Sequence, residues 1–125
     1  MGLPAELRLR RGPDITAAVR RGRRVRAGGL VLHALPRPEQ DGSGPAVPVH
    51  GPRVAFVAPR TSGPAVPRNR TRRRVQELLR TSVAAGRLDA DVDLVVRLLP
   101  EATVAGTGEL TGWLSQALRR LGTDL

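Results

Sequence analysis

The sequence predicts a single-domain α+β fold, a sandwich of a roughly four-stranded sheet with three helices in the order α-β-β-β-α-β-α. The chain has 125 residues, the size of one ordinary domain, and 40% of them are apolar, enough for one modest core. Short β-rich runs alternate with segments whose apolar residues recur at helical spacing. We see no internal repeat, so residues 1–125 are expected to form one domain.

The first helix is predicted over residues 13–21. Pro13 suits the first helical position, Asp14 places a carboxylate in the first turn, and Gly22 ends the pattern. Residues 1–6, which precede it, are expected to be disordered.

Strands are predicted at residues 30–35 and 53–58, where apolar and β-branched residues run together. The segment around Val25 can add an edge strand, which would give three antiparallel strands. Between them, residues 37–52 are rich in Pro, Gly and polar side chains and show no period. This composition predicts a flexible hairpin loop.

The second half of the chain predicts a loop, a long helix, a strand and a last helix. Two prolines and a glycine argue against a regular element at residues 60–67. Residues 68–85 have apolar side chains at helical spacing, and this helix should stop at Gly86. Residues 91–98 are apolar enough for a central strand. A final helix is expected from residue 107 or 108 to about residue 121.

Charge is the strongest compositional signal. The net charge is +10, and all 21 basic residues are arginine. Residues 53–87 hold nine arginines against one acid, and residues 1–36 hold eight against two, whereas residues 88–125 are acidic on balance. Arginine presents a planar fork of donors that matches phosphate oxygens. A polyanionic partner is therefore expected, with nucleic acid first.

The sharpest motif is a run of arginines at the start of the long helix. The first turn of a helix carries free N–H groups and partial positive charge, both of which attract phosphate. Like charges packed this densely repel one another, so a solvated basic face without an anion is the less favoured interpretation. The predicted RNA-binding residues are Arg68, Asn69, Arg70, Arg72, Arg73 and Arg74.

A second basic cluster lies in the first segment, and part of it can be read as a solubilising arm. We interpret it instead as an auxiliary surface that contacts phosphates. The predicted auxiliary contacts are Arg8, Arg10, Arg11 and Arg23.

Catalytic groups are scarce. The chain has no cysteine, which excludes disulfides, thiol catalysis and cysteine-bound zinc. His33 and His50 are too far apart in the sequence to indicate a metal site, and no serine has a plausible histidine partner. We therefore assign no catalytic residue and no protein-bound metal.

These residues resemble the protein subunit of bacterial ribonuclease P over residues 7–121. Three stretches carry the resemblance, and the third is the most specific. They are Leu7-Arg8-Leu9-Arg10-Arg11 with Asp14 and Gly22-Arg23; Arg53-Val54-Ala55-Phe56-Val57; and Gly63, Ala65-Val66, Arg68-Asn69-Arg70 and Arg72-Arg73.

The resemblance implies a left-handed βαβ crossover and a role in tRNA maturation. The signature helix would bind a catalytic RNA, and a cleft between the first helix and the sheet would bind the 5′ leader of precursor tRNA. Magnesium held by the RNA would activate the water, so this chain would be an accessory subunit without catalytic residues. The implied cleft residues are Ile15, Val19, Val31, Phe56 and Arg60.

Some positions depart from the family pattern. The family usually has phenylalanine where Ile15 and Val19 stand, and two lysines where Arg60 and Thr61 stand. It usually has asparagine where Pro64 stands.

We expect a cytoplasmic protein that needs no protein partner and no membrane. No apolar run approaches the roughly 20 residues that span a bilayer, and the first residues lack the order of a secretory signal.

Two alternatives remain open from the residues themselves. One is a general module for structured RNA or for DNA, for example a ribosome-associated one, without a catalytic RNA partner. The other is a small self-sufficient nuclease. It would use Asp89, Asp91 and Asp93, which alternate along a predicted strand, with magnesium.

Overall fold

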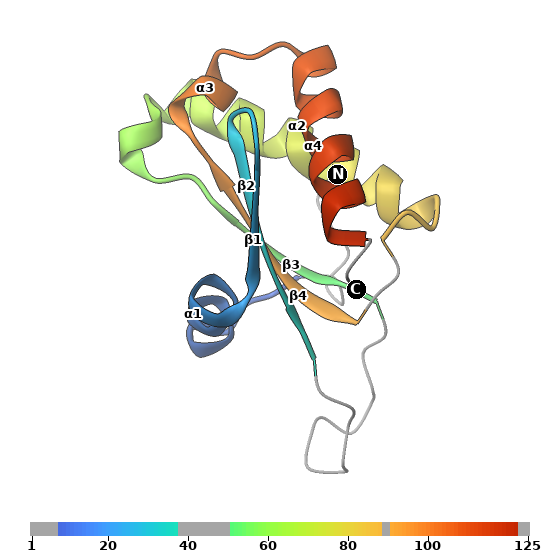
Figure 1. Cartoon of the computed structure of the whole chain (residues 1–125). Coiled ribbons are helices and arrows are strands. Elements are labelled where there is room, and N and C mark those ends of the chain that lie inside the picture. The colour runs from blue at the N-terminus through green and yellow to red at the C-terminus, as the bar shows by residue number, and fades with distance from the viewer. Residues whose placement is uncertain (1–7, 38–50, 89–90, 123–125) are drawn as a thin grey trace.

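A computed structural model describes residues 8–37, 51–88 and 91–122 of the chain (Figure 1). The predictions for residues 1–6 and for most of residues 37–52 lie outside the described residues. None of the described helices is long and apolar enough to cross a membrane.

Four strands form one mixed sheet in the spatial order β1-β2-β4-β3. β1 pairs with β2 and β2 with β4 in antiparallel register, whereas β3 runs parallel to β4. Their bounds are β1 (Arg23–Ala27), β2 (Leu30–Pro36), β3 (Arg53–Val57) and β4 (Val92–Leu98). The predicted edge strand around Val25 and the central strand at residues 91–98 are both confirmed.

The expected hairpin between β2 and β3 is wrong, because β4 lies between these two strands. Leu94, Val95 and Val96 are consecutive on β4 and all fully buried, so this strand needs apolar cover on both faces. Only a central position provides that cover, and the central position separates two strands that are adjacent in sequence.

The helices differ from the prediction mainly around residues 60–67 and after β4. Their bounds are α1 (Gly12–Arg21), the 3₁₀ turn η2 (Arg60–Ser62), α2 (Ala65–Ala84), α3 (Pro100–Thr103) and α4 (Thr107–Gly122). The predicted loop is therefore largely helical, and α2 begins at Ala65 rather than Arg68. Pro67 is tolerated because it lies in the first turn, where backbone N–H groups have no partner within the helix. The short helix α3 was not predicted.

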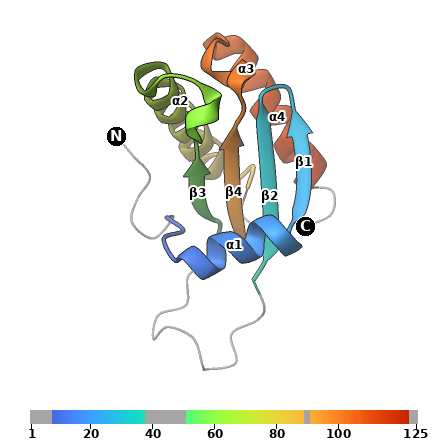
Figure 2. The ribbon, with the colours of Figure 1, turned by 90° about the vertical axis from the view of Figure 1, so that its left-hand side faces the viewer.

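The helices cover the two faces of the sheet unequally. α1 crosses one face, where Ala18 packs with Ala55 and Val95. α2, α3 and α4 cover the other face, where the larger core gathers residues such as Val75 and Leu114 (Figure 2). We call the first face the α1 side of the sheet.

The connection from β3 through α2 to β4 is a left-handed crossover. Figure 2 views the sheet from the α1 side, with β3 and β4 both pointing upward and β4 to the right of β3. Because α2 lies behind the sheet in this view, the chain turns in the sense opposite to the usual right-handed βαβ unit. The predicted crossover is thereby confirmed.

A two-glycine turn joins β1 to β2 beneath α4. Gly28 has a φ of 54°, in the left-handed region that glycine adopts readily. An added Cβ at Gly28 would lie 2.0 Å from Cε2 of Trp113, so the indole of α4 rests directly on the turn. Trp113 is thus partly buried against the hairpin.

Candidate nucleic-acid interface

The first half of α2 presents a row of exposed arginines. We call Arg70, Arg72, Arg73 and Arg74 the arginine ridge; all four are exposed, as is Asn69. None of the four arginine side chains forms a hydrogen bond or ion pair with any other residue that the structure describes. Four unpaired cations on one rigid helix make a strong site for a polyanion.

The remaining signature arginine, Arg68, has a structural contact as well. It is partly buried, and its Nη1 donates a hydrogen bond to the carbonyl oxygen of Gly63 at 3.2 Å. This contact ties the start of α2 to the preceding loop. Arg68 therefore helps to position the ridge, in addition to any contact with a ligand.

The opposite face of α2 holds the ridge in place. Thr71, Val75 and Leu79 are buried at successive turns, as the helical spacing predicted for the last two. The hydroxyl of Thr71 donates to the carbonyl oxygen of Ala102 at 3.4 Å. Further along α2, Arg80 pairs with Glu77 and so does not extend the row of unpaired arginines.

Two residues that sequence reasoning missed anchor the loop before α2. Ser62 is buried, and its Oγ donates to the carbonyl oxygen of Leu98 at 2.6 Å. Thr103 Oγ1 donates to the carbonyl oxygen of Ser62 at 3.2 Å. These bonds connect η2 to the end of β4 and to α3. Looking for a histidine partner of each serine tests only for catalysis, so it could not reveal this structural role of Ser62.

The implied leader-binding residues do not all come together. Ile15 is partly buried on the α1 side, and Val19 on the same helix remains 37% exposed. Val31 is fully buried on β2, whose neighbours Leu30 and Leu32 face the other way, into the larger core. Arg60 is exposed in η2.

Among the implied leader-binding residues, Phe56 lies on the opposite face of the sheet. It packs against the larger core, on the face covered by α2 and α4. Strand alternation explains the difference, because Val54 shares that face whereas Ala55 and Val57 face α1. Val57 therefore takes the position beside α1 that the prediction gave to Phe56.

The auxiliary arginines lie along the stretch of chain that begins before α1 and continues into β1. Arg8, Arg10, Arg11 and Arg23 are all exposed. Arg8 forms a bridge beside Val54 at the outer edge of β3, and Arg11 lies 3.9 Å from Asp14 on α1. Arg10 and Arg11 directly precede α1, whereas strand alternation points Arg23 to the same face as Val25, which packs in the larger core on the side of α2 and α4.

The carboxylates of the nuclease alternative have structural partners. Asp93 is only 6% exposed and accepts hydrogen bonds from Arg53 Nε at 2.9 Å and Arg37 Nη1 at 3.2 Å. Asp91 accepts from the backbone N–H of Gly51 at 2.6 Å. Asp89 lies outside the described residues. No three Asp, Glu, His or Cys side chains in the described ranges form a group that could hold a metal ion.

His33 is a buried ionisable group on the α1 side. It is 3% exposed, and neither ring nitrogen has a hydrogen-bond partner among the described residues. Burial, followed by the positive charges of Arg97 and Arg24, lowers its pKa below the ordinary 6.5.

The lowered pKa of His33 predicts a pH dependence of folding. The unfolded chain takes up a proton at His33 below about pH 6.5, whereas the folded chain resists it. The free energy of unfolding should therefore fall as pH drops through this value and be constant above it. Urea unfolding between pH 5 and 8 measures this, and His33→Phe should remove the corresponding part of the slope. His50→Gln is the matched control and should keep it; equal slopes for wild type and His33→Phe would contradict the assignment.

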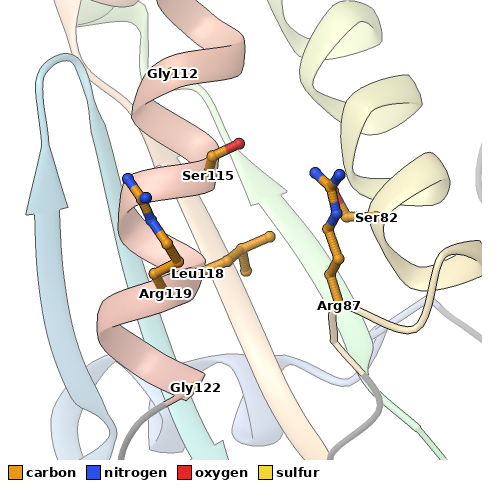
Figure 3. Close-up of a pocket in the computed structure, with 7 residues that line it drawn as sticks. All are labelled: Ser82, Arg87, Gly112, Ser115, Leu118, Arg119 and Gly122. Carbon is orange, nitrogen blue, oxygen red and sulfur yellow. The ribbon is translucent and has the colours of Figure 1, made fainter.

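A pocket lies away from all these residues, between α2 and α4. It is lined by Ser82, Arg87, Gly112, Ser115, Leu118, Arg119 and Gly122 (Figure 3). None of the predicted site residues lines it. Arg87 is exposed and makes no side-chain hydrogen bond or ion pair within the described part of the chain.

The α+β fold with its left-handed crossover and its exposed arginine ridge defines a basic RNA-binding protein. The family model described as Ribonuclease P matches residues 3–122. A ribonuclease P protein component of Rhodococcus erythropolis is 38% identical over 119 residues, which are 95% of this chain and 91% of the relative. One from Streptomyces avermitilis is 41% identical over 119 residues, 95% of this chain and 94% of the relative. This chain belongs to the ribonuclease P protein family.

Solved structures agree at the level of the fold. The ribonuclease P protein of Staphylococcus aureus superposes with a TM-score of 0.74 at 19% identity, covering 92% of this chain and 94% of that one. The sheet order and the crossover described above are therefore those of a fold already seen in crystals.

Proposed function

We propose that this chain is the protein component of a bacterial ribonuclease P, which promotes endonucleolytic 5′ maturation of precursor tRNA in the cytoplasm. The arginine ridge carries the proposal, because four unpaired arginines on a rigid helix suit the phosphates of a large folded RNA. In this proposal α2 binds the catalytic RNA, and the α1 side of the sheet binds the 5′ leader. Family membership supports the same assignment.

The proposed division of labour gives the chemistry to the RNA. The buried carboxylate of Asp93 pairs with Arg53 and Arg37, and no three Asp, Glu, His or Cys side chains among the described residues form a group that could hold a metal ion. We propose that the magnesium ions of the reaction are held mainly by the RNA. This chain would contribute affinity for the precursor and the position of its leader.

Reconstituted cleavage tests the proposal. A labelled precursor tRNA is incubated with the catalytic RNA alone, the protein alone, or both, at magnesium concentrations where the RNA alone is slow. We expect cleavage only when the RNA is present, and strong stimulation when the protein is added. Cleavage by the protein alone, or no stimulation, would contradict the proposal. Competition with an unrelated folded RNA separates this role from general RNA binding, which would show no preference.

A further inference from the structure

We propose that Arg24 and Arg97 form a phosphate-binding site beside His33, and that it takes a backbone phosphodiester of the single-stranded leader. The inference rests on the proposed function, since it specifies how the α1 side of the sheet holds that RNA. It also adds two residues that the signature motif does not include.

Strand register brings the two arginines to the same patch. Arg24 on β1 is directly opposite His33 on β2, which in turn is opposite Val95 on β4. Arg97 is two residues beyond Val95 and therefore diagonal to His33 on the same face. Directly opposed Cβ atoms lie about 5 Å apart and diagonal ones about 7–8 Å apart, within reach of long side chains. Both arginines act electrostatically on His33, which agrees with this geometry.

The other arginines on this face already have partners. Arg26, the next residue of β1 on the α1 side, pairs with Glu101 at 3.3 Å. Arg53 on β3 pairs with Asp93 at 2.9 Å. By contrast, the side chains of Arg24 and Arg97 form no hydrogen bond or ion pair with another described residue. Of these four arginines, Arg26 and Arg53 are therefore paired with acidic side chains, whereas Arg24 and Arg97 are not.

Arg97 is the more unusual of the two. It lies on the central strand and is partly buried between Val31 and Val57 in the register. Charged side chains in such places normally have a counter-charge, because burying an unpaired cation is costly. An external anion would supply that counter-charge.

His33 is a second observation that points to a ligand at this site. Only 3% of it is exposed, and both ring nitrogens lack a partner within the described residues. Buried polar atoms are nearly always hydrogen-bonded, so each exception calls for an explanation. A phosphate held by Arg24 and Arg97 would place acceptor oxygens next to this ring.

The site also fits the apolar character of α1 in this chain. Ile15 and Val19 line the same side but cannot stack on bases as aromatic side chains do. Binding through phosphate rather than through base stacking would hold a leader with little regard for its sequence.

The test compares binding of two ligands to the reconstituted ribonucleoprotein. One ligand is a precursor tRNA with a leader, and the other is mature tRNA without one. We expect Arg97→Gln to weaken precursor binding about 10-fold, the effect of losing one charge-assisted hydrogen bond, and to leave mature tRNA binding unchanged. The log–log salt slope for the precursor should fall by about 0.7. Arg24→Gln, on the exposed edge strand, should act in the same way and guards against a folding defect of the central-strand variant.

Arg87→Gln is the matched control, since it removes one exposed arginine between α2 and α4 and should change neither affinity. A leader with methylphosphonate linkages throughout identifies the group that is bound. It should weaken binding by the wild type, and weaken it less in Arg97→Gln, in which one of the two phosphate-binding arginines is already absent. Equal loss for precursor and mature tRNA, or no loss in folded Arg24→Gln and Arg97→Gln, would overturn this site. The proposed function would stand in that case if the wild-type protein still stimulates cleavage.

Discussion

Replacing Arg70 and Arg73 together by alanine is expected to weaken binding of the catalytic RNA by about 100-fold or more. The two residues are one helical turn apart on the arginine ridge, exposed and without partners among the described residues. Each charge-assisted contact contributes about 1.5–3 kcal/mol, and the loss of two exceeds the roughly 2.7 kcal/mol that corresponds to 100-fold. Stimulation of precursor-tRNA cleavage at low magnesium should be lost in parallel.

The double variant should remain folded, because exposed side chains away from structural contacts change stability by only about 0.5 kcal/mol. Arg80→Ala is the control on the same helix, because Arg80 is paired with Glu77 and lies outside the ridge. Filter binding and thermal unfolding measured on the same samples separate affinity from stability. RNA binding by the folded double variant at the wild-type level would exclude α2 as the main contact.

Gly28→Ala is expected to cost about 3–4 kcal/mol of folding free energy. The left-handed backbone disfavours any side chain by roughly 1–2 kcal/mol. In addition, the new Cβ would lie 2.0 Å from Trp113 Cε2 and 2.2 Å from Nε1, so the indole must move, which costs about 1–3 kcal/mol. For a domain of this size the melting temperature should fall by more than about 10 °C.

Gly112→Ala is the matched control for Gly28. It lies within α4, where an added Cβ meets nothing within 4 Å, so the substitution should stabilise the helix by about 0.5–1 kcal/mol. Calorimetry of both variants measures their melting temperatures and their free energies of unfolding. A Gly28→Ala protein as stable as the wild type would show that Trp113 does not rest on the turn.

The sequence was sufficient for the four strands, the three longer helices and the ridge, although not for η2 and α3. Apolar spacing predicted the stripe of Val75 and Leu79, and the opposite face of the same helix then had to expose its arginines. These are local patterns, read from residues within a few turns of one another. The left-handed crossover, in contrast, was available only through resemblance, because general chain chirality favours the other hand.

What could not be predicted depends on contacts between distant segments. Residues 54–57 are apolar at successive positions, so alternation alone does not decide which face Phe56 takes; the pairing with β4 does. The partners of Ser62 are 36 and 41 residues away, at Leu98 and Thr103. The candidate phosphate site likewise joins three strands, and no local motif unites Arg24, His33 and Arg97.

The central position of β4 has a consequence for how the chain folds as it is synthesised. β2 and β3 are complete well before β4, yet neither strand has its principal neighbour until Val92–Leu98 is available. A nascent chain ending before Val92 would hold a β1–β2 hairpin and an isolated β3, with apolar strand edges uncovered. Such long-range pairing slows folding and leaves intermediates prone to aggregation. The sheet can therefore be completed only when its last strand, β4, inserts between β2 and β3.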